Sequence, residues 1–168
     1  MKKVLDVLKS NIAFFVILVV SLVFYLIAVC GGDFQTSVFW GEVTHYSFVN
    51  GAANGRILSF LYVIIPAVCM LAITVLNFVK PKKRDGKLAL VFVGLFIGLA
   101  TLAGVMLLLI PIALFNEVAV DYTAIGDWKA LTADVYYTRT FNFPLLSMVI
   151  SLIFTLVLGC FASATLSD

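Results

Sequence analysis

Charged residues are scarce in this sequence. Only 12% of the 168 residues are charged and 63% are apolar, whereas soluble domains carry about a quarter charged residues. This composition excludes an ordinary soluble enzyme and predicts an integral membrane protein. The 11 Lys and Arg residues barely outnumber the 9 Asp and Glu residues. Because nucleic-acid binding needs a strongly basic surface, we expect no nucleic-acid partner.

Residues that carry chemistry are scarce as well. His45 is the only histidine, which excludes a histidine cluster for a metal ion. Cys30, Cys69 and Cys160 fall at different depths of separate apolar stretches and form no Cys-x-x-Cys motif, so we expect no disulfide. The chain has no serine-hydrolase elbow, no phosphate-binding glycine loop and no His-Glu-x-x-His motif. We therefore expect no catalytic residue, no cofactor and no metal.

Four long uncharged stretches dominate what remains. They are 11–30, 57–79, 88–116 and 140–167, and each reaches the ~20 residues that a helix needs to cross the hydrocarbon core. We predict an all-α membrane protein, a four-helix transmembrane bundle that forms a single domain over residues 1–168. The third stretch is longer than the bilayer is thick, so it must tilt, bend or project beyond the lipid.

Basic residues gather on one predicted side of the membrane. Eight of the 11 precede the first stretch or lie in the inner loop 80–87, and they are Lys2, Lys3, Lys9, Lys80, Lys82, Lys83, Arg84 and Lys87. The longer loops, 31–56 and 117–139, hold three basic residues but six acidic ones. Because short basic loops stay in the cytoplasm, we predict a multi-pass cell-membrane protein with cytoplasmic N- and C-termini and two outer loops.

Small and hydroxyl residues recur in the third and fourth stretches. The fourth carries Ser147, Ser151, Thr155, Gly159 and Ser163, and the third carries Gly94, Gly98 and Thr101, with Ala100 and Gly104 repeating the spacing nearby. A spacing of four places such residues along one face of a helix, and small faces let membrane helices pack closely. We expect these two faces to pack together. The alternative is that the hydroxyls line a polar pathway, although no stretch contains Asp, Glu, Lys, Arg or His.

Aromatic and β-branched residues fill the outer loops. Segments 38–49 and 134–141 have the composition of strands, and a turn is expected at 50–55. Paired together, the two segments would form a small extracytoplasmic β cap. The candidate partner-binding residues of this outer face are Trp40, Tyr46, Phe48, Trp128, Tyr136 and Tyr137. The alternative is that these rings only anchor the spans at the membrane interface, where Trp and Tyr are enriched.

In its layout the chain resembles the claudin-like tetraspan membrane proteins. The shared features are inner termini, four spans, a longer first outer loop and strand-like outer segments. The first-loop signature of that family combines Trp residues with a Cys pair; this loop has Trp40 but no cysteine, and only Cys30 lies at its membrane edge. The resemblance implies lateral or cell-surface association without catalysis, and it transfers no functional residue to this chain.

These features together favour a function based on association. We expect a non-enzymatic protein that contacts the lipid bilayer and a protein partner or further copies of itself. It would be an accessory subunit of an envelope complex or a claudin-like surface organiser. A small transporter or channel component is the alternative, and an envelope enzyme is less favoured.

Overall fold

The structure is a computed structural model, which describes residues 11–33, 35–39, 42–53, 57–81, 86–124, 135–138 and 143–167. Its elements along the chain are α2 (Ile12–Cys30), β1 (Gln35–Phe39), β2 (Glu42–Tyr46), α3 (Phe48–Ala53), α4 (Ile57–Val79), α5 (Lys87–Ala124), β3 (Val135–Thr138) and α7 (Phe143–Ser167). Helices α2, α4, α5 and α7 are long and apolar enough to cross a membrane. The prediction of four membrane-length helices that pack together is confirmed.

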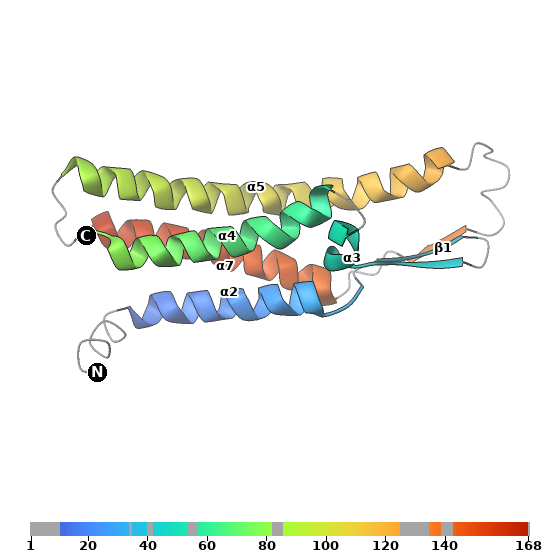
Figure 1. The fold of residues 1–168 in the computed structure, drawn as a ribbon, viewed down its shortest axis with the longest axis horizontal. Helices are drawn as coiled ribbons and strands as arrows, with labels where there is room; N and C mark the ends of the chain where they lie inside the picture. Colours follow the sequence, from blue (N-terminus) through green and yellow to red (C-terminus); the bar gives the residue numbers. More distant parts are fainter. Residues whose placement is uncertain are drawn as a thin grey trace.

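The four long helices run side by side (Figure 1). The start of α2, the end of α4, the start of α5 and the end of α7 lie at one end of the bundle, and the three strands lie at the other. Helix α7 contacts each of the other three and is the most buried of the four. Because a helix satisfies its backbone groups internally, such long apolar segments can face lipid without leaving unpaired amides.

Two apolar clusters form the interior of the bundle. The cluster nearer the strands includes Tyr25, Tyr62, Met106 and Leu152, and the cluster nearer the other end includes Phe14, Ile73, Phe96 and Leu158. Large apolar side chains also cover the outside of every long helix, for example Val16, Leu71, Leu90 and Ile153. An exposed apolar surface of this extent is what a bilayer-spanning bundle presents to lipid.

Helix α5 is the longest element, with 38 residues. At 1.5 Å per residue it is about 57 Å long, and a hydrocarbon core is only ~30 Å thick. The helix projects beyond the other long helices at the end where the strands lie (Figure 1). Its candidate membrane span is Lys87–Ile110.

The strands form one antiparallel sheet in the order β2-β1-β3. Strand β1 pairs with β2 through five residue pairs, from Gln35–Tyr46 to Phe39–Glu42, and with β3 through four, from Thr36–Thr138 to Phe39–Val135. Segments from both loops therefore meet in the same sheet.

A short helix, α3, occupies most of the segment where the sequence predicts a turn. Ser47 explains its start, because the Ser47 hydroxyl oxygen accepts a hydrogen bond from the Asn50 backbone N–H at 3.1 Å. A serine in this position caps the first turn of a helix. The Phe48 ring then packs on Tyr62 of α4, with centroids 5.8 Å apart, so α3 lies between the bundle and the sheet (Figure 1).

Candidate functional site

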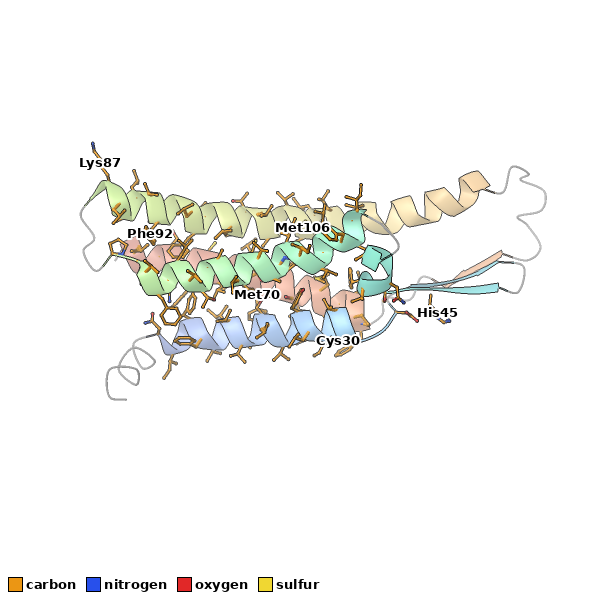
Figure 2. The ribbon with its side chains drawn as sticks, in the orientation of Figure 1. Cys30, His45, Met70, Lys87, Phe92 and Met106 are labelled. Carbon is orange, nitrogen blue, oxygen red and sulfur yellow. The ribbon has the colours of Figure 1, made fainter. Side chains whose placement is uncertain are left out.

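The small and hydroxyl residues of α7 lie inside the bundle. Ser147, Ser151, Thr155, Gly159 and Ser163 are all buried. Two of them, Ser151 and Thr155, form a polar cluster with Ser21 of α2 and Met70 of α4. The cluster lies between the two apolar halves of the core, and Figure 2 labels Met70 within it. It is the candidate site that the spans themselves provide.

Ser21 and Ser151 form a reciprocal pair across the α2–α7 contact. The Ser21 hydroxyl donates to the Ser151 carbonyl and the Ser151 hydroxyl donates to the Ser21 carbonyl, both at 3.0 Å. The Ser21 Oγ also lies 2.8 Å from Thr155 Oγ1 and 3.2 Å from Met70 Sδ. Each hydroxyl has a single proton to donate, and all three hydroxyls find acceptors within the cluster. The Ser21 and Ser151 donors are satisfied across the helix contact, and the Thr155 donor is satisfied within α7 by the Ser151 carbonyl.

Tyrosine hydroxyls join α2 to α4 and α4 to α5. The Tyr25 hydroxyl of α2 donates to the Val63 carbonyl of α4, and the Tyr62 hydroxyl of α4 donates to the Met106 carbonyl of α5 at 2.8 Å. Neither the tyrosines nor Ser21 was among the sequence-predicted site residues. A signal for Ser21 was present, because Ser21 and Tyr25 are the only hydroxyl residues in the apolar run of α2.

Helices α5 and α7 approach closely at Gly159. A Cβ atom built on Gly159 would lie 2.8 Å from the Ala100 Cβ and 2.9 Å from the Phe96 carbonyl oxygen. Phe96, Ala100 and Ala103 are buried on the face of α5 that meets α7. A glycine is required at this position because the Ala100 side of α5 fills the space that a side chain would need.

The structure puts the α5 side of this contact on a different face from the one predicted. Gly94, Gly98 and Thr101 are exposed, and a Cβ built on either glycine meets nothing within 4 Å. Helical geometry places these three residues opposite Phe96 and Ala103. The prediction that Gly94, Gly98 and Thr101 contact the small and hydroxyl residues of α7 (the α7 stripe) is therefore corrected. Helix α7 packs instead on the face with the alanines, because that face also carries the Phe96 ring that fills the core.

The structure places the predicted outer-face aromatic residues in different parts of the fold. Phe48 is 3% exposed and packs on Tyr62, so it stabilises the fold. This corrects the prediction that Phe48 belongs to the partner-binding surface. Tyr46, Tyr136 and Tyr137 belong to strands β2 and β3. The register puts Tyr46 and Tyr137 at positions of one sheet face and Tyr136 at a position of the other. Trp40 and Trp128 lie outside the described residues.

An ion pair joins the sheet to the end of α2. His45 Nδ1 of β2 lies 2.8 Å from Asp33 Oδ2, three residues beyond Cys30, and both side chains are partly exposed. Figure 2 shows His45 at the sheet end, beyond Cys30. Such exposed pairs contribute little to stability.

Two further observations bear on chemistry. Within the described segments, no group of three or more His, Cys, Asp or Glu residues has the proximity that a metal ion requires. Cys69 is buried in α4, whereas Cys30 and Cys160 are exposed free thiols on α2 and α7.

No family model, no curated protein and no solved structure matches this chain.

Proposed function

We propose that this four-span integral membrane protein acts without catalysis, by binding a protein partner through the β2-β1-β3 sheet. It would be an accessory subunit of an envelope complex or a surface organiser of the claudin-like kind. One observation carries the proposal: strands from two loops that are far apart in the sequence meet in one sheet, which projects from one end of the bundle (Figure 1). A sheet built from both loops is a larger surface than either loop alone offers.

The polar groups inside the bundle support association over transport. The Ser21 and Ser151 hydroxyls donate to each other's backbone carbonyl, and the Thr155 hydroxyl donates to the Ser151 carbonyl, so the Ser21–Ser151 pair links α2 to α7. A conducting pathway would need such groups to face water or a substrate. The sheet, in contrast, has edge strands β2 and β3, each paired on one side only within the described residues. Edge strands and aromatic-rich faces are surfaces that proteins use to bind partners.

The orientation belongs to the same proposal. The sheet end is the outer side, because basic residues concentrate in 80–87, and the end of α4 and the start of α5, which this segment joins, lie at the opposite end of the bundle. Single cysteines at Ser37 and Thr132 should react with an impermeant thiol reagent in intact cells, and one at Asp85 should not. Cys30 and Cys160 are exposed and must first be replaced by alanine. Labelling of the Asp85 position before lysis would contradict this orientation.

The association test compares two neighbouring tyrosines on opposite sheet faces. Tagged wild type, Tyr136→Ala and Tyr137→Ala are purified in mild detergent, and the proteins that accompany each are identified. If a partner binds one face, its binding should weaken by the ~1–4 kcal/mol typical of an aromatic anchor in one variant only. The melting temperature of the isolated bundle should stay unchanged in both variants. The variant that keeps its partner serves as the matched control.

Two results would contradict the proposal. Folded Tyr136→Ala and Tyr137→Ala proteins that both retain every wild-type partner would exclude the sheet as the binding surface. A wild-type protein that purifies alone as an oligomer and conducts ions in liposomes would favour the channel alternative.

A further inference from the structure

A lysine at the end of α4 is held in place by α7. Lys80 directly follows α4, and its Nζ donates a hydrogen bond to Thr165 Oγ1 at 3.1 Å. The Thr165 hydroxyl donates its own proton to the Ala162 carbonyl at 2.9 Å, so its oxygen is available to accept from the ammonium. An ammonium has three donors. Within the described residues one of the three is used, and the other two are available to a further acceptor.

The Lys80 ammonium has no anion beside it in the described part of the chain. Asp33, Glu42, Glu117 and Asp121, the acidic residues described, belong to the sheet end or to the projecting end of α5. Burial between the helix ends lowers the pKa of Lys80 below its usual value. A partly buried ammonium is less well solvated than one in water, so an anion beside it would stabilise this corner of the bundle.

The depth of Lys80 matches the headgroup layer. Helix α4 has 23 residues, which is about 35 Å at 1.5 Å per residue, slightly more than the ~30 Å hydrocarbon core. The adjoining segment 80–87 contains five basic residues and a single acid, Asp85. Basic clusters next to a membrane span attract anionic lipid headgroups.

We propose that the Lys80–Thr165 corner, between the ends of α4 and α7, binds the phosphate of an anionic phospholipid headgroup. Thr165 holds the ammonium at a fixed position, and the ammonium donates its free N–H groups to the phosphate oxygens. The site is separate from the proposed partner surface, because it lies at the opposite end of the bundle. It requires only that this end of the bundle lies in a headgroup layer.

The test measures lipid binding to the full-length protein in detergent by native mass spectrometry. Dioleoyl phosphatidylglycerol and dioleoyl phosphatidylcholine are titrated separately. Wild type should bind the phosphatidylglycerol more tightly, and Lys80→Gln should weaken that binding about fivefold, the effect of one lysine at a membrane surface. Lys87→Gln is the matched control, because it removes the same charge from the same segment at an exposed position. It should weaken phosphatidylglycerol binding less than Lys80→Gln does, because Lys87 lies outside the Lys80–Thr165 corner.

Further variants and a competition experiment distinguish this site from the alternatives. Thr165→Val removes the hydroxyl that holds Lys80 and should also weaken phosphatidylglycerol binding, and it gives the answer if Lys80→Gln does not fold. Equal losses in Lys80→Gln and Lys87→Gln would overturn the site in favour of diffuse attraction to the basic segment. Equal binding of the two lipids, or wild-type binding by Thr165→Val, would also overturn it. Displacement of phosphatidylglycerol by an excess of inorganic phosphate would show a site for free phosphate instead.

Discussion

Substitution of Gly159 by alanine is the sharpest test of how the bundle packs. The new Cβ would lie 2.8 Å from the Ala100 Cβ, 2.9 Å from the Phe96 carbonyl oxygen and 3.3 Å from the Ala100 Cα. Carbon atoms in contact rest ~3.5–4.0 Å apart, so α5 and α7 would have to separate by roughly 0.7 Å or more. Two of the three close atoms belong to backbone, which a rotamer change cannot move. We expect Gly159→Ala to lower the free energy of unfolding by the ~1–3 kcal/mol typical of overpacking.

Gly98→Ala is the matched control on the facing helix. Gly98 is exposed, and its added Cβ would meet nothing within 4 Å. Alanine is the better helix former by up to ~1 kcal/mol, so this variant should be as stable as wild type or more stable. Combining Gly159→Ala with Ala100→Gly should recover part of the loss, because the Cβ–Cβ contact disappears while the Phe96 carbonyl remains close. A double-mutant cycle measures that recovery directly.

The assay is thermal unfolding of purified protein in one mild detergent, followed by circular dichroism. A melting temperature of Gly159→Ala equal to that of wild type would refute the close approach of α5 and α7. A fall in Gly98→Ala as large as that in Gly159→Ala would show that the Gly94–Gly98 face is covered. In that case the apparent size of the wild type in detergent should report a second copy.

Two hydroxyl deletions should weaken the helix contacts by smaller amounts, each read from the same thermal unfolding. Ser21→Ala removes the donor to the Ser151 carbonyl, and because Thr155 still donates to that carbonyl, the free energy of unfolding should fall by only ~0.6–1.7 kcal/mol. Thr101→Val is the control, because the Thr101 hydroxyl bonds within its own helix. An equal loss in both variants would argue against the cluster. Tyr62→Phe removes the bond to the Met106 carbonyl and should cost a similar ~0.6–1.7 kcal/mol, and wild-type stability would count against the α4–α5 link.

The four spans were predictable because bilayer thickness sets their length. Which faces meet was harder to predict, and α5 shows why. Gly94 and Gly98 have the same spacing as Ala100 and Gly104, so spacing alone gives two candidate faces. The structure uses the second, where Phe96 fills the core and Gly159 leaves room for Ala100. The choice depends on the volumes of residues on two helices, which a one-helix pattern does not contain.

The α7 stripe shows a second limit. Its period predicted a single face, and all five residues are buried. The sequence predicted α5 as the partner of the whole stripe, whereas in the structure Ser151 and Thr155 bond to Ser21 of α2 and Gly159 meets α5. A hydroxyl needs an acceptor at ~3 Å, and the nearest one depends on how the helices are arranged around α7. Composition alone does not specify that arrangement.

The outer loops show how local signals compete. The run 38–49 has strand composition throughout, yet the structure has the hairpin β1–β2 and then α3. Ser47 caps that helix, and Phe48 leaves the expected surface to pack on Tyr62. A serine three residues before an asparagine is a weak signal beside so many β-branched residues. The burial of Phe48 follows from the position of α4, which no local pattern predicts.

Replacing Asn77 by an apolar residue tests whether unsatisfied polar groups destabilise this bundle, and the test depends on whether the free energy of unfolding rises or falls. Its side chain is 7% exposed, and its Oδ1 has no hydrogen-bond partner among the described residues. Ile73, one turn earlier on the same helix, belongs to an apolar cluster. An unsatisfied buried polar atom costs ~1–3 kcal/mol, so Asn77→Leu should raise the free energy of unfolding by about that amount. Ser151→Ala, also a buried polar-to-apolar change, removes a satisfied donor and should lower it. Opposite signs would show that satisfaction, and not polarity itself, determines stability in this bundle. A lower stability of Asn77→Leu would instead show that Oδ1 has a donor, such as a bound water.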